Sequence, residues 1–154
     1  MIYVSNKNVH ISIKQMRYQQ QQQQQVAAQQ QQEFPNLLIN AVRRNDVGLI
    51  KRLLSNGADA KATNNDGETA LMFATRKGDN KMVDILLPKS DVKAVSNSGY
   101  TALMLAAKYG HFKIVERLLP ESDAKATNWR KETAYDIAKK YHRYQILRLL
   151  QKYN

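Results

Sequence analysis

The chain has 154 residues, no cysteine, and a formal net charge of +11 from 24 Lys and Arg against 13 Asp and Glu. This length allows one domain with a buried core, or a tail joined to a small domain. The lack of cysteine excludes disulfides, thiol catalysis and cysteine-based zinc sites, and it fits an intracellular location. No segment approaches the roughly 18 consecutive apolar residues of a membrane helix, and residues 1–18 lack the continuous apolar centre of a signal peptide.

The first part of the chain is dominated by glutamine. Residues 19–32 are all glutamine except for the Val-Ala-Ala segment at 26–28. Such a tract has little apolar surface to bury, so we expect residues 1–33 to form a disordered Gln-rich tail. Glutamine is also a fair helix former and polyglutamine is prone to aggregation, so a fraying helix and a self-associating tail are the alternatives. The composition changes abruptly at residues 33–35, where we place the domain boundary.

The rest of the chain repeats itself with a period of 32 residues. Thr69, Thr101 and Thr133 recur at this spacing, and Gly67 and Gly99 precede the first two by two residues. A further copy upstream keeps the alanine and leucine positions but lacks the Gly and Thr. A fixed period between about 20 and 50 residues is typical of a solenoid or array.

Each repeat is predicted to contain two short helices. In the third repeat, Thr101 is placed to cap the first helix, and Gly110 is placed to end it. A second apolar set follows over residues 112–119, and Pro120 stops that helix. Neither helix is long enough to be stable alone, so the stacked repeats should share one core and form one cooperative domain.

These segments resemble the ankyrin-repeat family. The family core Gly-x-Thr-Pro-Leu-His-x-Ala is matched by GETALMFA at 67–74 and GYTALMLA at 99–106. Ala replaces the motif Pro and Met replaces its His in both copies, so the hydrogen bond of that His is lost. The resemblance implies an all-α solenoid of stacked helix pairs with short β-hairpin-like turns. The domain would span residues 34–154, with repeats near 34–64, 65–96, 97–128 and 129–154, the outer two acting as caps.

The resemblance also implies where a partner would bind. Ankyrin domains usually contact proteins with their turn tips and with the inner, concave face of the first helices. In this chain every repeat places at least one cation at the end of its first helix, and stacking should align these cations in a row. The expected partner-binding residues are Arg43, Arg44, Arg76, Lys77, Tyr100, Lys108, Tyr109, Trp129, Lys140 and Tyr141.

Two of these assignments have structural alternatives. Cations near a helix C-terminus also complement the helix dipole, without any partner. Trp129 would either anchor a partner from a turn tip or cover the open end of the core beneath the last repeat.

We therefore expect a non-catalytic protein-interaction module that binds an acidic protein segment on a basic, Tyr- and Trp-containing face. The alternatives are a nucleic-acid-associated basic protein, or a scaffold or tether that uses the polyglutamine tail. No cofactor or metal is expected, because His10, His111 and His142 lack metal-site spacing and no phosphate-binding loop occurs. We expect a monomer unless the tail self-associates. The address would be cytoplasm or nucleus, although ankyrin arrays also serve as exported effectors of intracellular bacteria.

Overall fold

The computed structural model describes residues 6–153, and the side chains of residues 12–25 and 37–153. The chain divides into two compact units, Met1–Phe34 and Pro35–Asn154. Helix α1 spans Asn6–Arg44. The other helices are α2 (Val47–Ser55), α3 (Ala70–Lys77), α4 (Asn80–Leu86), η1 (Leu87–Lys89), α5 (Ala102–Tyr109), α6 (Phe112–Leu118), α7 (Ala134–Lys140), α8 (Tyr144–Leu150) and η2 (Gln151–Tyr153).

Helix α1 corrects the expectation of a disordered tail over residues 1–33. Its backbone is helical from Asn6, while residues 1–5 lie outside the described part of the chain. No glycine or proline occurs between residues 6 and 34, and the helix propensity of glutamine lies less than about 0.7 kcal/mol below that of alanine. The side chains of residues 12–25 are all exposed. The backbone therefore matches the helical alternative, in which local hydrogen bonds rather than burial hold the segment.

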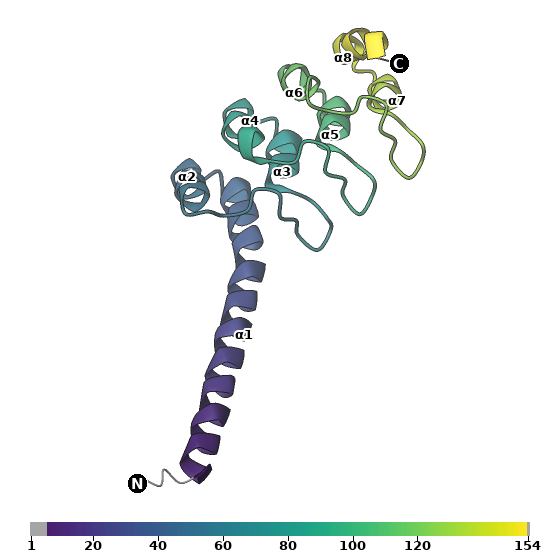
Figure 1. Ribbon diagram of the computed structural model, residues 1–154. Helices are drawn as coiled ribbons and strands as arrows, with labels where there is room; N and C mark the ends of the chain where they lie inside the picture. The colour runs from purple at the N-terminus through teal and green to yellow at the C-terminus, as the bar shows by residue number, and fades with distance from the viewer. Residues whose placement is uncertain (1–5, 154) are drawn as a thin grey trace. The chain divides into compact units, whose positions relative to one another are not determined.

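The second unit is a row of stacked helix pairs, as Figure 1 shows. The end of α1 pairs with α2, and the pairs α3–α4, α5–α6 and α7–α8 follow. Helix α5 packs against both α3 and α7, while α6 packs against α4 and α8. The first helices lie between the second helices and the projecting turns. This arrangement confirms the predicted all-α solenoid.

One apolar core runs through the stack. The motif leucines Leu71 and Leu103 are fully buried, and so are Met72 and Met104 at the positions of the motif His. The second helices add their own inward residues to the same cluster. These are Ile50, Leu54, Met82, Val83, Leu86, Ile114, Val115, Leu118, Ile146 and Leu150.

The helix ends follow the repeat. The hydroxyls of Thr69, Thr101 and Thr133 accept the N–H three residues further on, at 3.3, 3.2 and 3.2 Å, which confirms the predicted caps. In the last repeat Asp136 returns the contact by accepting the Thr133 N–H at 2.9 Å, which completes a capping box. The residue in the place of the motif His thus caps helix α7.

Left-handed residues end the first helices. Gly78 and Gly110 have φ values of 74° and 83° after α3 and α5. Asn45 and His142 adopt the same conformation, with φ values of 60° and 55°, in the two outer repeats that lack this glycine. The turn is therefore kept in all four repeats.

The carbonyl groups at the ends of these helices receive hydrogen bonds from the following repeat. Three different side chains supply them, each reaching back by 34 or 35 residues. The contacts are Lys77 Nζ to the Arg43 carbonyl at 3.0 Å, His111 Nε2 to the Arg76 carbonyl at 3.2 Å, and Arg143 Nε to the Lys108 carbonyl at 3.2 Å. These bonds satisfy carbonyls that have no partner within their own helix.

The turns between repeats are short hairpins. Asn64, Ser96 and Asn128 donate their backbone N–H to the carbonyl four residues ahead, at 3.0, 3.0 and 3.1 Å. Neighbouring turns also touch at their tips, where the Asn97 N–H donates to the Asp66 carbonyl at 2.8 Å.

Candidate functional site

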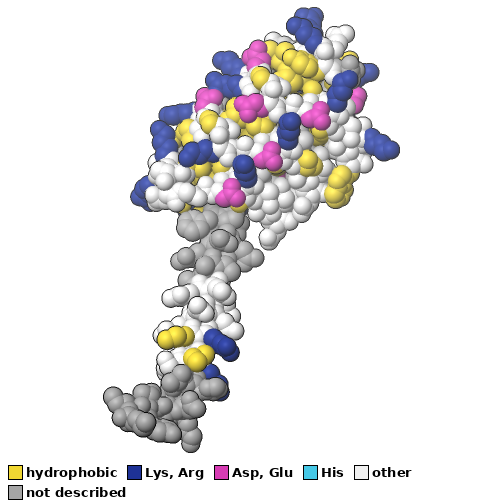
Figure 2. Space-filling model, viewed as in Figure 1, with side chains coloured by type: hydrophobic (Ala, Val, Ile, Leu, Met, Phe, Trp, Pro, Cys, Tyr) yellow, Lys and Arg dark blue, Asp and Glu magenta, His cyan; other side chains and the backbone are white. Residues whose placement is uncertain are grey.

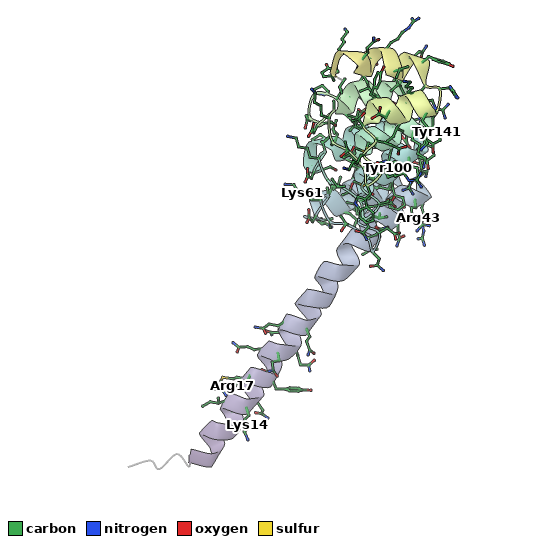
Figure 3. The ribbon with its side chains drawn as sticks, turned by 90° about the vertical axis from the view of Figure 1, so that its right-hand side faces the viewer. Lys14, Arg17, Arg43, Lys61, Tyr100 and Tyr141 are labelled. Carbon is green, nitrogen blue, oxygen red and sulfur yellow. The ribbon has the colours of Figure 1, made fainter. Side chains whose placement is uncertain are left out.

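The structure places eight of the ten expected partner-binding residues at the C-terminal ends of first helices. Each first helix ends at one such pair, the last of which extends one residue beyond α7 to Tyr141, and we call the four pairs the ladder face. Its residues are Arg43, Arg44, Arg76, Lys77, Lys108, Tyr109, Lys140 and Tyr141. In Figure 3, Arg43 and Tyr141 lie along one edge of the stack, and Lys61 lies on the opposite edge.

Two cations of the ladder face are paired with carboxylates of their own repeat. Arg76 forms an ion pair with Glu68, and Lys140 forms one with Glu132 at 2.6 Å. The pKa of the Glu132 carboxyl is lowered, first by the hydrogen bond from the Asn128 amide and then by the one from Lys140. The Lys140 pKa is raised, chiefly by its hydrogen bond to Glu132. These two cations are therefore largely compensated within the chain.

Lys108, at the same position in the third repeat, has different surroundings. Its ammonium lies over three tyrosine rings, 5.3 Å from the centroid of Tyr100, 5.6 Å from Tyr109 and 5.7 Å from Tyr141. Tyr109 also stacks on His111, with ring centroids 6.3 Å apart. Tyr109 and Tyr141 remain 41% and 39% exposed. A cation over aromatic faces is attracted by the ring quadrupoles, but its formal charge is retained.

The cations of the first two repeats share an aromatic neighbour. Arg43 and Arg76 lie over the Phe73 ring, 5.8 and 5.2 Å from its centroid. Arg44 is exposed. Lys77 is also exposed, but its ammonium donates hydrogen bonds to backbone carbonyls, including that of Arg43. For Lys77, the structural alternative therefore applies: its charge interacts with carbonyl groups at the end of a helix.

The remaining two residues, Tyr100 and Trp129, belong to the turns. Tyr100 is half-buried at the base of its hairpin and contacts Lys108. Trp129 is 78% exposed at the tip of the last hairpin. The alternative in which Trp129 covers the end of the core is therefore wrong. Most of its side-chain surface is open to solvent.

Elsewhere on the repeats charges of both signs alternate. Figure 2 shows one face on which Lys and Arg side chains are interspersed with Asp and Glu. One outer-helix pair, Arg117 with Asp84, forms an ion pair. Among the described residues no group of three or more His, Cys, Asp or Glu could hold a metal ion. Within the same residues no helix combines the length and apolar character needed to cross a membrane.

Sequence reasoning identified the row of cations but missed its carboxylates. Glu68 and Glu132 recur at the repeat spacing, eight residues before Arg76 and Lys140. Because the first residue of each pair lies in a turn, a separation of eight residues does not indicate neighbours on one helix. The pairing can be predicted only once the hairpin is known to fold back over its helix. The same spacing joins Tyr100 to Lys108.

Comparison with known families agrees with the repeat pattern. A family model described as "Ankyrin repeats (3 copies)" matches residues 38–128 and, in a second alignment, residues 90–154. No curated protein matched the chain in a sequence search. The family matches together cover well over half of the sequence and coincide with the helix pairs, the threonine caps and the buried motif leucines. The chain therefore belongs to the ankyrin-repeat family.

Proposed function

We propose that this protein is a non-catalytic binding module that holds an acidic protein segment on the ladder face. Ankyrin repeats are in general protein–protein interaction modules, and the fold alone does not select the partner. The observation that carries the proposal is charge left uncompensated beside exposed aromatic side chains. Within residues 37–153 no ion pair involves Arg43, Arg44 or Lys108.

The aromatic side chains supply the second half of the argument. Tyr109, Tyr141 and Trp129 are exposed although each is a large, rigid group. Tyrosine, tryptophan and arginine are the residue types that most often dominate binding energy at protein interfaces. Cations at the rim chiefly raise the association rate and its salt sensitivity, while buried aromatic anchors slow dissociation. The ladder face and the Trp129 tip together provide both components.

The test starts from peptides selected on the full-length chain. Random dodecapeptides displayed on phage are selected for binding, and the enriched sequences are synthesised and measured by fluorescence anisotropy. We expect enrichment of Asp and Glu. Replacing Arg43 and Arg44 by Glu should weaken binding at least tenfold, mostly through slower association. The matched control replaces Lys81 and Lys113 by Glu. Both lysines are exposed on the second helices α4 and α6, so this variant changes the net charge by the same amount.

A second pair of variants tests the aromatic contribution. Changing Tyr109 and Trp129 to Ala should together weaken binding by more than about 2 kcal/mol, the usual scale of an interface hot spot. Binding that responds to the α4 and α6 charges but ignores the ladder face would overturn the proposal. A DNA oligonucleotide that competes for the same face, with affinity falling steeply as salt rises, would instead favour the nucleic-acid alternative.

A further inference from the structure

The three complete repeats differ in the residue that contacts the cation at the end of the first helix. The residue at the base of the hairpin meets the cation eight residues later at the end of the first helix. The pairs are Glu68 with Arg76, Tyr100 with Lys108, and Glu132 with Lys140. In two repeats the chain neutralises its own cation, and in the middle one it surrounds the cation with tyrosines.

The difference lies in the side chain and leaves the turn unchanged. Asn64 Oδ1, Ser96 Oγ and Asn128 Oδ1 accept the backbone N–H of the hairpin-base residue in the three repeats, at 2.9, 3.1 and 3.0 Å. The same backbone geometry therefore presents a carboxylate twice and a phenol ring once. The outcome is that positive charge on this part of the ladder face is concentrated at the third repeat.

The tyrosines also change how the charge is presented. Tyr100, Tyr109 and Tyr141 come from a turn, a helix end and the neighbouring repeat, and they converge on one ammonium. Aromatic faces remove water from around the ammonium without cancelling its charge. An anion that reaches such a cation meets a partly desolvated charge, where electrostatic attraction is stronger than in bulk water. The same rings offer apolar contact to the groups on either side of that anion.

We propose that Lys108 with Tyr100, Tyr109 and Tyr141, here called the Lys108 cluster, binds a single carboxylate side chain of the partner. This proposal rests on the proposed function and sharpens it. The segment recognised would carry one Asp or Glu flanked by apolar or aromatic residues, rather than a run of acids. A carboxylate matches the single formal charge of Lys108 and can accept hydrogen bonds from its ammonium. Tyr100 would then be the residue that sets specificity.

The decisive variant is Tyr100→Glu, because it copies the residue found at this position in the neighbouring repeats. It should close the third ion pair and remove the charge that the partner needs. The control is Tyr100→Phe, which keeps the ring and the charge of Lys108. Far-UV circular dichroism and urea unfolding check that both variants fold as the unaltered chain does.

The probes are the dodecapeptides selected on the full-length chain, each with a counterpart in which Asn or Gln replaces the acid. We expect the amide counterpart to bind at least tenfold more weakly to the unaltered protein. Tyr100→Glu should cost a similar factor, and Tyr100→Phe should change affinity less than threefold. Should Tyr100→Glu fail to fold, Lys108→Glu tests the same contact, because a peptide with Lys in place of its acid should regain the affinity.

The outcomes separate this inference from the proposed function. Peptides that lose affinity with Arg43→Glu and Arg44→Glu but are insensitive to both Tyr100→Glu and Lys108→Glu would overturn the role of the Lys108 cluster and leave the proposed function intact. Selected peptides dominated by acidic runs, or a phosphoserine peptide that binds more tightly than its glutamate form, would also overturn it. Peptides insensitive to all these changes would overturn the proposed function itself.

Discussion

Replacing Gly99 by Ala tests whether the hairpins pack on one another as described. Gly99 has a φ of 80°, and a Cβ built on it would lie 2.7 Å from both the backbone nitrogen and the Cδ1 atom of Trp129. Gly57 has a φ of 85°, but a Cβ there meets no atom within 4 Å. The two glycines therefore share the conformational strain and differ in the steric conflict.

The expected magnitudes follow from this difference. A left-handed conformation costs a non-glycine residue about 1–2 kcal/mol, and the loss of unfolded-state freedom returns about 0.4–1 kcal/mol. Gly57→Ala should thus destabilise the protein by about 1 kcal/mol. In Gly99→Ala the obstacle is backbone of the next turn, so an overpacking cost of about 1–3 kcal/mol is added. The total for Gly99→Ala should be about 3 kcal/mol.

Urea unfolding followed by far-UV circular dichroism measures both losses, with equal m-values indicating unchanged exposure on unfolding. Trp129 fluorescence, from the single tryptophan of the chain, reports whether the neighbouring turn moves. Equal losses for Gly57→Ala and Gly99→Ala would refute the reasoning, because they would mean that the hairpin of Trp129 does not rest on Gly99.

Three further predictions concern stability and titration. Leu103→Ala should lower the free energy of unfolding by about 2–5 kcal/mol, since Leu103 is fully buried in α5; a loss below about 0.5 kcal/mol, normal at a surface, would contradict the repeat register. Thr75→Val should raise it by about 1 kcal/mol, because the buried Thr75 hydroxyl has no hydrogen-bond partner among the described residues; a decrease would show that the hydroxyl is satisfied. In an NMR titration the Glu132 carboxyl should ionise below its ordinary pKa of 4.5, and Lys140→Gln should raise the midpoint only part of the way, because the Asn128 bond remains. Since the folded-state pKa is lowered, the stabilisation by this carboxyl is complete above pH 4.5 and is lost as the pH falls through the lowered pKa; an unshifted midpoint would rule the pairing out.

The repeat architecture could be predicted from the sequence because its signals are local and periodic. Thr101 begins a helix and Gly110 ends one, and each does so for reasons contained in a few neighbouring residues. The end repeats were harder, since Asn45 and His142 replace glycine and still adopt positive φ. For residues 6–33 the expected disorder was wrong, and the backbone matches the helical alternative that the helix propensity of glutamine had left open.

The positions of the candidate site could be predicted from the sequence, whereas the contacts that its side chains make could not. The period placed Arg76, Lys108 and Lys140 at one point of each repeat, as the structure has them. Which side chain meets each cation depends on how the hairpin folds back, and that geometry brings Glu68 to Arg76 but Tyr100 to Lys108. Such contacts join a turn to a helix end, so no helical or strand periodicity encodes them.

The hydrogen bonds that reach back across the repeat junctions limit how this array could be rearranged. Lysine supplies the bond at the first junction, histidine at the second and arginine at the third. Lys77 reaches from the end of its helix α3, whereas His111 and Arg143 reach from the residue before α6 and α8. A shuffled array would therefore bring together donors and carbonyls that were not fitted to each other. The repeats of this protein are similar in sequence, yet the hydrogen bonds at their junctions differ and therefore favour the order in which the repeats occur.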